Sequence, residues 1–339
     1  MRHNLQALGW NQAFEVAAKN IDSSFIIGRV SRLDRGWSTI KTSATSNPDD
    51  MIRVRNIGAD IAVGDWVAVA PELDRIDHVL PRYSALIRRA SSDAVRAEQH
   101  AVAANIDTVF IVHAATNDSN ERRVERELVL AFDSGATPVL VLTKNDLSAA
   151  PEHVAALRDV ARVCGIACHV VSGLTGDGLD ELAEYGKDHQ TVAVLGASGV
   201  GKSTLVNRLV GDSKQQVGEV REGDQRGRHT TGAADLVVLP NGGWLIDTPG
   251  LRALNLWTSG RGIERAFADI FLLAEDCKFR DCKHQDEPGC AVRAAIGRGE
   301  LSVERLESMG RLVAEELALE DEQKVRVRMS NRKGMRKLT

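Results

Sequence analysis

The sequence lacks the features that mark membrane, secreted and disulfide-rich proteins. It has no run of about eighteen apolar residues, so a membrane-spanning helix is not expected. The start, MRHNLQALGWNQAF, lacks the apolar core of a signal peptide, and we expect a cytoplasmic protein with no membrane partner. The five cysteines are an odd number in a chain without an export signal, which favours reduced thiols or metal ligands over a disulfide framework.

Aromatic residues and net charge are also low. Aromatic side chains make up 4% of the 339 residues, so no aromatic-rich surface dominates. The net charge is −4, which does not indicate a nucleic-acid partner for the chain as a whole. The end, QKVRVRMSNRKGMRKLT, is nevertheless strongly basic. Such a tail is typical of a solvated, disordered arm that either binds RNA or only keeps the end soluble.

Short runs of alternating apolar and polar residues fill the region from about 23 to 91. Examples are SFIIGRVSRL, MIRVRNIG and GDWVAVAP, separated by Gly, Asp, Asn and Pro. Several short strands without a helical period predict a small closed β-barrel. Five strands in this length fit an OB-like barrel, although an SH3-like barrel would give the same pattern.

From about residue 104 the sequence alternates buried strands with amphipathic helices. NIDTVFIVHAA and TPVLVLTKNDL are expected strands, and ERRVERELVLAFDSG between them is an expected helix. This α/β alternation predicts a mostly parallel sheet with helices on both faces. After residue 254 the sequence becomes helical and contains a Cys/His cluster. We therefore expect four parts, namely an N-terminal extension (1–22), an RNA-binding barrel (23–91), a nucleotide-binding domain (92–254) and a helical metal-binding domain with a basic tail (255–339).

The stretch GASGVGKST matches the phosphate-binding loop G-x₄-G-K-[ST], and it lies between an expected strand and an expected helix. Its glycines let backbone N–H groups point at phosphate oxygens at the start of the helix. Lys202 should reach the β- and γ-phosphates, and Ser203 should bind Mg²⁺. The predicted phosphate site consists of Gly196, Ala197, Ser198, Gly199, Val200, Gly201, Lys202, Ser203 and Thr204.

The stretch TKND matches a guanine-reading motif. The Asp146 carboxylate can accept hydrogen bonds from both N1–H and the exocyclic amine of guanine, a pattern that adenine does not offer. An alternative for Asp146 is a helix N-cap. We expect Lys144 to pack along the base and Asn145 to brace the loop. Ser172 begins SGL, where a backbone N–H meets guanine O6. The predicted guanine site is Thr143, Lys144, Asn145, Asp146 and Ser172.

The stretch DTPG follows an apolar strand, where Asp247 would hold Mg²⁺ through water and the Gly250 N–H would sense the γ-phosphate. Alone this pattern usually marks a turn, but with the phosphate loop upstream it indicates a nucleotide site. The guanine-reading motif precedes both, so the predicted GTPase domain is circularly permuted. Permutation is tolerated because packing, and not chain order, builds such a site.

Between these motifs lies RGRHTT, where a mobile switch loop belongs. Leu251 follows DTPG at the position where Ras-like GTPases carry a water-positioning glutamine, and leucine cannot orient water. We expect His229 to assist catalysis, the alternative being a loop histidine that contacts RNA or phosphate. The hydroxyl groups of the two threonines can close on Mg²⁺. The predicted Mg²⁺ ligands are Ser203, Thr230, Thr231 and Asp247.

A Cys/His cluster places four soft ligands within fourteen residues in the pattern C-x₄-C-x-H-x₅-C. Three thiolates and an imidazole suit a closed tetrahedral Zn²⁺ site. Because no ligand position is left for water, we expect one structural zinc per chain. Cys164 and Cys168 are expected to be core or incidental thiols. The predicted zinc ligands are Cys277, Cys282, His284 and Cys290.

Together these motifs resemble the bacterial small-subunit-dependent GTPases of the RsgA (YjeQ) family over nearly the whole chain. The resemblance rests on TKND before GASGVGKST, on RGRHTT, on DTPGL and on the C-x₄-C-x-H-x₅-C cluster. It implies an OB-fold, a permuted GTPase domain and a zinc-containing helical domain. It also implies binding to the 30S ribosomal subunit and its 16S rRNA in late assembly, with GTP hydrolysis to GDP stimulated by the subunit. In the family the histidine of the RGRHTT loop, here His229, assists catalysis. Residues 1–22 lie outside the family pattern and receive no role.

An acidic protein that binds rRNA must concentrate positive charge locally. The candidates are the tail from Lys324 to Lys337 and the barrel residues Arg29, Arg32, Arg35, Lys41, Arg53 and Arg55. We expect a monomer. Two other functions stay open at this point: a regulatory GTPase switch with a protein partner, and a non-catalytic RNA-binding module that holds GTP for stability.

Overall fold

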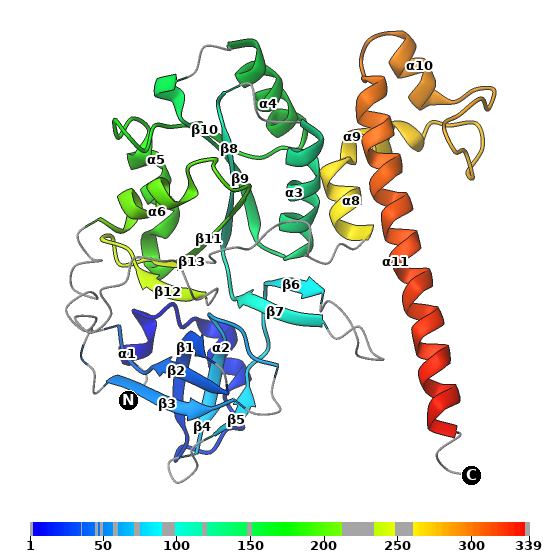
Figure 1. The fold of residues 1–339 in the computed structure, drawn as a ribbon. Helices are drawn as coiled ribbons and strands as arrows, with labels where there is room; N and C mark the ends of the chain where they lie inside the picture. The colour runs from blue at the N-terminus through cyan, green and yellow to red at the C-terminus, as the bar shows by residue number, and fades with distance from the viewer. Residues whose placement is uncertain are drawn as a thin grey trace.

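The computed structural model describes most of the chain in three groups of elements (Figure 1). A β-barrel and the N-terminal helices lie at the bottom, an α/β layer lies above them, and the C-terminal helices lie at one side. The described residues are 3–34, 36–44, 47, 50–56, 60–70, 75–89, 99–116, 121–147, 151–211, 234–247 and 260–335.

Two short N-terminal helices, α1 (His3–Gln6) and α2 (Gln12–Ala17), belong to the packed body of the protein. The Asn11 carboxamide caps α2 by accepting from the N–H groups of Ala13 and Phe14. Leu8 and Phe14 are buried in the same hydrophobic core as the α/β strands. This segment, to which the sequence assigns no role, therefore helps to build the core.

The barrel has the OB-like arrangement expected from the sequence. Strand β1 pairs antiparallel with β2 and β4, β2 pairs with β3, and β4 pairs with β5. A parallel bridge between Arg55 and Arg75 joins β3 to the start of β5 and closes the ring. The strands are β1 (Ile26–Asp34), β2 (Trp37–Lys41), β3 (Met51–Arg55), β4 (Trp66–Val69) and β5 (Ile76–Val79).

The α/β layer is built on a mostly parallel sheet in the order β10–β9–β8–β11–β13. Antiparallel β12 then pairs with β1 of the barrel, with Asp235 opposite Arg32. One sheet thus connects the two parts, and the division at residues 22, 91 and 254 stays a prediction. The strands are β8 (Thr108–Ala114), β9 (Thr137–Thr143), β10 (Cys168–Val170), β11 (Thr191–Gly196), β12 (Asp235–Val238) and β13 (Trp244–Asp247).

Helices cover both faces of this sheet, as the alternation in the sequence predicts. On β8, Val109 and Ile111 pack in one hydrophobic cluster with α3 and α4, whereas Phe110 and Val112 pack in another with α5 and α6. These central strands are buried on both faces, which explains their continuous apolar sequences. The helices are α3 (Glu121–Asp133), α4 (Pro151–Val163), α5 (Leu179–Ala183), α6 (Lys202–Val210) and the 3-10 helices η2 (Asn145–Leu147) and η3 (Glu184–His189); a hairpin of β6 (Ala85–Arg89) and β7 (Gln99–Ala104) adjoins the layer.

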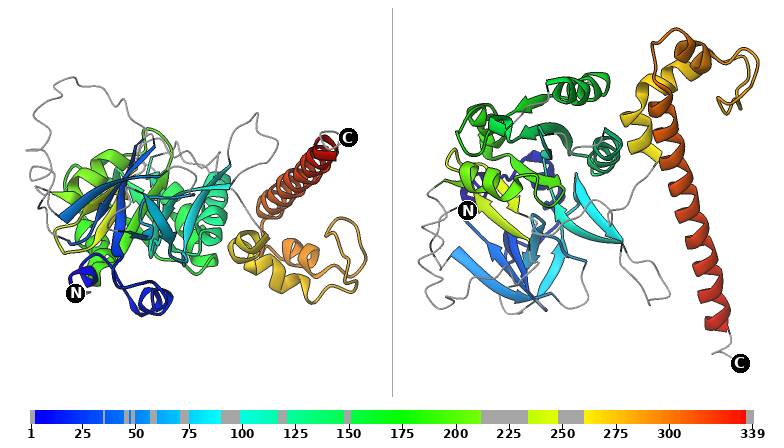
Figure 2. Two further views of the ribbon diagram at one scale, coloured as in Figure 1. Left: turned by 90° about the horizontal axis from the view of Figure 1, so that it is seen from below. Right: turned by 45° about the horizontal axis from the view of Figure 1, so that its top comes forward.

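The C-terminal helices are held against α3 by a group of ion pairs. The Arg305 guanidinium contacts Asp269 at 2.7 Å and Glu125 of α3 at 2.8 Å, and its side chain is only 11% exposed. The Gly262 N–H also donates to Asp133 of α3 at 2.7 Å. In both views of Figure 2 these helices lie at the side of the body. They are α8 (Gly260–Ala266), α9 (Ala268–Ala274), α10 (Ala291–Gly297) and α11 (Val303–Met335).

Helix α11 extends along the side of the molecule and reaches the level of the barrel (Figure 1). The sequence predicts a disordered arm from Lys324 onward, and for residues 324–335 this is wrong because the backbone stays helical. The preceding stretch AEELALEDE is rich in strong helix formers, and ion pairs one turn apart, such as Asp321 with Lys324 at 3.6 Å, support the continuation.

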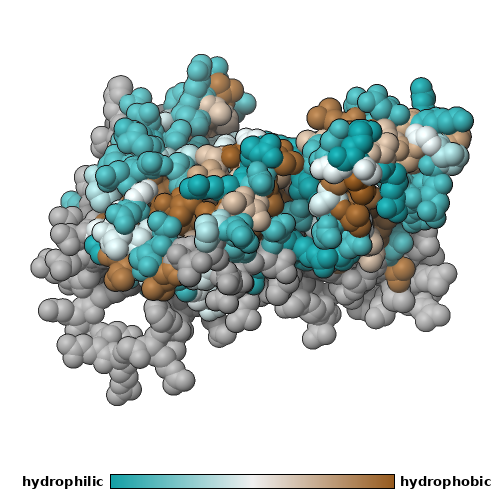
Figure 3. Space-filling view, turned by 90° about the horizontal axis from the view of Figure 1, so that it is seen from above, coloured by the Kyte–Doolittle hydropathy of each residue, from teal (hydrophilic) through white to brown (hydrophobic). Residues whose placement is uncertain are grey.

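The surface of the described residues is mixed. Figure 3 shows hydrophobic residues in separate groups on a mostly hydrophilic face. No helix in the part of the chain that the structure describes is both long enough and apolar enough to cross a bilayer.

Arg29 is buried where the N-terminal segment, the barrel and the α/β layer meet. Its side chain is 1% exposed, so the sequence-based expectation that Arg29 offers charge to RNA is wrong. Burial lowers the pKa of the guanidinium, and nearby acidic groups partly offset this effect. The guanidinium donates to four acceptors, the Leu8 carbonyl at 2.7 Å, Gly64 carbonyl at 3.2 Å, Asn105 carbonyl at 3.1 Å and Thr191 Oγ1 at 2.8 Å.

We predict that Arg29→Met lowers the free energy of unfolding by about 3 kcal/mol or more, because it leaves buried acceptors without a donor. Urea unfolding followed by circular dichroism measures the change. Arg32→Met is the matched control: Arg32 is one-third exposed and pairs with Asp34 and Asp235, so its loss should cost at most about 1 kcal/mol. Equal, small losses for both variants would contradict this role of Arg29.

Candidate functional site

The phosphate-loop motif lies between the carboxyl end of β11 and the amino end of α6. Gly196 has φ +150°, and a Cβ there would lie 2.3 Å from the Val112 carbonyl oxygen. Gly201 has φ +98° and begins α6 without a side-chain cap, so the first N–H groups of this helix are not used by a capping side chain. The two glycines therefore allow a tight turn that ends in helix N–H groups without a side-chain cap, an arrangement suited to anions.

Lys202 folds back over this loop. Its ammonium donates to the Gly196 carbonyl at 2.8 Å and also to the Ala197 carbonyl. Burial lowers the pKa of Lys202, whereas the carboxylates of Glu127 and Asp247 act to raise it. The positive charge of Lys202 thus lies at the phosphate loop and interacts with Asp247 at the end of β13.

The TKND motif follows β9, the second strand away from β11. Thr143 Oγ1 lies 3.1 Å from the His113 carbonyl and also within hydrogen-bond distance of the Val200 carbonyl in the phosphate loop. Lys144 has φ +60°, which turns the chain sharply after the strand. The Asn145 N–H donates to the Val171 carbonyl at 3.2 Å and ties this loop to the SGL segment.

Ser172 fixes the orientation of Asp146. Its hydroxyl donates to Asp146 Oδ1 at 2.6 Å and accepts from the N–H groups of Leu174 and Thr175 at 3.2 and 3.1 Å. Ser172 is fully buried, whereas Asp146 is exposed. The contacts described for the Asp146 side chain thus run to the SGL loop, and its carboxylate lies at the surface where a ligand can approach.

The SGL loop is in turn fastened to α6, a feature that the sequence did not reveal. Arg208 of α6 donates to the carbonyls of Gly173 at 2.9 Å and Leu174 at 2.7 Å. A Cβ at Gly173 would lie 3.0 Å from Thr204 Cγ2, so the loop packs closely on the helix. Three segments far apart in the sequence, 143–147, 172–177 and 196–208, therefore form one unit.

Asp247 ends β13, next to β11, and lies half-buried at the same edge of the sheet. Ser203 is exposed in the first turn of α6. The other predicted residues of the phosphate side lie outside the described residues: His229, Thr230, Thr231, Gly250 and Leu251.

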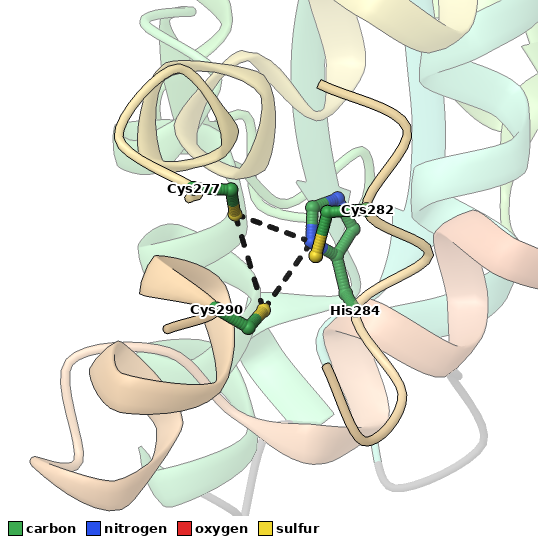
Figure 4. Close-up of side chains that lie close together, drawn as sticks. All are labelled: Cys277, Cys282, His284 and Cys290. Carbon is green, nitrogen blue, oxygen red and sulfur yellow. Dashed lines mark hydrogen bonds between the residues drawn. The ribbon is translucent and has the colours of Figure 1, made fainter. Parts of the chain in front are cut away.

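The predicted metal ligands come together in the C-terminal part (Figure 4). The donor atoms of Cys277, Cys282, His284 and Cys290 all lie within 4.8 Å of one another. Cys277 Sγ lies 3.9 Å from Cys290 Sγ and 3.7 Å from His284 Nδ1, and the third side of this triangle is 3.5 Å. Bonds of about 2.3 Å to sulfur at the tetrahedral angle put two sulfurs about 3.8 Å apart, so the cluster fits one tetrahedral metal ion.

The loop that carries His284 is braced by polar side chains. Glu287 accepts from the N–H groups of Lys283 at 2.9 Å and Gln285 at 2.8 Å. Arg293 of α10 donates to the carbonyls of His284 and Gln285, each at 2.9 Å. His284 itself has φ +59°, an uncommon value outside glycine. These contacts hold the imidazole toward the three thiols.

Comparison with known proteins identifies relatives over most of the chain. The sequence profile of the RsgA GTPase family matches residues 79–257. The chain is 39% identical to the small ribosomal subunit biogenesis GTPase RsgA of Methanosarcina acetivorans, over 91% of this chain and 84% of the relative. It is 40% identical to the protein of the same name from Streptomyces coelicolor, over 97% of this chain and 91% of the relative.

Solved structures of known proteins share the fold of this chain. The chain is similar to YjeQ from Thermotoga maritima, with a TM-score of 0.61 and 25% identity over 86% of this chain and 99% of that structure. It also shares its fold with YloQ, a circularly permuted GTPase, with a TM-score of 0.60 and 22% identity over 88% of this chain and 97% of that one. The fold class expected from the sequence is therefore confirmed.

We predict that the purified chain contains about one metal ion, bound by the Cys/His cluster. Elemental analysis by plasma mass spectrometry should find this ion in the wild type and lose it in Cys290→Ser. Cys164→Ser is the control, because the Cys164 thiol lies elsewhere and donates to the Ala266 carbonyl at 3.2 Å. Equal metal content in both variants would exclude the cluster as the binding site.

Proposed function

Because this chain belongs to the RsgA family of GTPases, we propose that it hydrolyses GTP to GDP and phosphate while bound to the small (30S) ribosomal subunit, late in maturation of that subunit. The observation that carries the proposal is the single unit formed by the segments 143–147, 172–177 and 196–208. The names of the relatives favour this function over a regulatory switch with a protein partner.

In the proposed site, guanine is read by the TKND and SGL loops. The Asp146 carboxylate accepts from N1–H and the exocyclic amine of the base, and its bond from Ser172 holds it in place for this. Lys144 packs along the base, Asn145 braces the loop through Val171, and a backbone N–H of the Ser172 loop meets guanine O6.

The phosphates bind along residues 196–204, where the N–H groups at the start of α6 and the Lys202 ammonium supply donors and positive charge. Ser203, Thr230, Thr231 and Asp247 would hold Mg²⁺, and their oxygen atoms are the ligands that this ion prefers. Bound there, Mg²⁺ neutralises charge on the β- and γ-phosphates. The Gly250 N–H senses the γ-phosphate, and His229 assists the attack of water in place of a glutamine.

We assign Zn²⁺ to the Cys/His cluster, since three thiolates and one imidazole at these distances suit that ion. All four ligands come from the protein, so the role is structural. In the proposed arrangement residues 255–339 form the zinc domain, residues 92–254 the GTPase domain, and residues 23–91 the barrel that contacts 16S rRNA.

Among the barrel residues, we propose Arg53 and Arg55 as the side chains that contact RNA. Arg53 and Arg55 are exposed and lie 5.2 and 5.4 Å from the centre of the Trp37 ring. Two guanidinium groups beside an aromatic ring offer positive charge, and Arg side chains also stack on bases. Arg32 is already paired with two aspartates, and Arg35 lies outside the described residues. We place the protein in the cytoplasm as a monomer.

We predict that Asp146→Asn weakens GTP binding about tenfold or more and improves binding of xanthosine triphosphate, because the amide suits the xanthine edge. Fluorescence titration with each nucleotide measures the two changes in affinity. Asp159→Asn is the control, since its carboxylate is exposed on α4, accepts from Arg162 at 3.1 Å and lies outside the three segments of the site. If Asp146→Asn binds both nucleotides as the wild type does, Asp146 does not read the base.

We predict that purified small subunits raise the rate of GTP hydrolysis, and that His229→Ala lowers the stimulated rate about a hundredfold or more with little effect on GTP binding. Phosphate release with and without subunits measures both effects. Binding should weaken as salt rises, since contacts to rRNA release counterions. A chain that hydrolyses GTP equally with and without subunits, and does not sediment with them at low salt, would exclude the ribosomal function.

A further inference from the structure

A buried charged cluster lies behind the phosphate loop, and neither the motifs nor the proposed function assigns it a role. It consists of His113 at the end of β8 and of Glu127 and Arg123 on α3. Glu127 is fully buried, and its Oε2 lies 2.7 Å from His113 Nε2. Its other oxygen accepts from Arg123 Nε at 3.2 Å. Arg123 is 45% exposed, so the carboxylate is buried but its cation reaches the surface.

Backbone contacts tie this cluster to the phosphate loop. Gly196 pairs with Val112, the residue before His113, in the β8–β11 ladder. The His113 carbonyl lies 3.1 Å from the Thr143 hydroxyl, which also contacts the Val200 carbonyl. The Lys202 ammonium donates to the Gly196 carbonyl at 2.8 Å, so it contacts the residue of β11 that pairs with Val112, the neighbour of His113.

The charges of the cluster act on the phosphate site in opposite directions. Burial is the main cause that lowers the pKa of Lys202. Among the charged neighbours, the Glu127 carboxylate acts most strongly to raise it, and Arg123 acts to lower it. An anion at this place repels the phosphates of a nucleotide, and a cation attracts them.

We infer that Glu127 and Arg123 set the affinity of this GTPase for nucleotide phosphates, Glu127 weakening and Arg123 strengthening it, and that both are positioning residues of the phosphate site. The inference rests on the proposed phosphate-binding role of residues 196–204. GTP carries more negative charge than GDP, so the effect on GTP is the larger one.

Isothermal titration of the full chain with GDP and with a non-hydrolysable GTP analogue tests this. Glu127→Gln keeps the size and a hydrogen-bonding group but removes the charge, and it should tighten analogue binding about three- to tenfold. Arg123→Gln should weaken it by a similar factor, and both changes should be smaller for GDP. Arg122→Gln is the matched control: it removes the same charge one residue away, where the side chain lies 3.7 Å from Glu307 of α11, and should leave affinity unchanged.

The two variants should change the affinity in opposite directions. This separates an electrostatic role from a structural one, because loss of structure would weaken binding in both variants. Weaker binding by both Glu127→Gln and Arg123→Gln, or no change in either, overturns the inference. If Glu127→Gln does not fold, variants of its exposed partner Arg123 test the inference instead. The affinity for the GTP analogue should fall in the order Arg123→Lys, Arg123→Gln, Arg123→Glu. Equal affinity in all three variants overturns the inference. A wild type that binds neither nucleotide refutes the proposed function itself, which is a distinct outcome.

Discussion

The parallel pairing of β8 with β11 is the constraint on which the site depends. It brings Gly196 so close to the Val112 carbonyl that no side chain fits at Gly196. It also places the His113 carbonyl where Thr143 can link the TKND loop to the phosphate loop. The two loops follow the carboxyl ends of β9 and β11, parallel strands that flank β8, so they meet at one edge of the sheet whatever their order in the chain. Circular permutation is tolerated for this reason.

Helix α3 connects this edge to the C-terminal helices. Glu127 on one face contacts His113 behind the phosphate loop, while Glu125 on another contacts Arg305 at the root of α11. The Arg305 guanidinium also holds Asp269 of α9 and lies 4.8 Å from the centre of the Phe267 ring. One helix thus carries two acidic groups, two residues apart, that contact His113 behind the phosphate loop and Arg305 of the C-terminal helices.

The sequence predicts most reliably what depends on short contiguous segments. The phosphate loop, the TKND motif and the Cys/His spacing each contain their chemistry within a few residues, and the alternation of strands and helices identifies the layers. Contacts between distant residues are not visible in this way. Arg29 appears as one more surface charge, yet its partners Asn105 and Thr191 lie 76 and 162 positions away. Burial of Glu127 has one sign in the sequence: an acidic residue occupies a position on the apolar face of its helix.

The length of α11 has a mechanical consequence. At about 1.5 Å per residue its 33 residues span about 50 Å, and the ion pairs described between it and α3 and α9 lie in its first part, from Arg305 to Glu315. A small tilt of the anchored end beside α3 therefore becomes a larger displacement of the far end. Over this length a tilt of about 5° displaces the last turn of α11 by about 4 Å, more than the difference between a formed and a broken hydrogen bond.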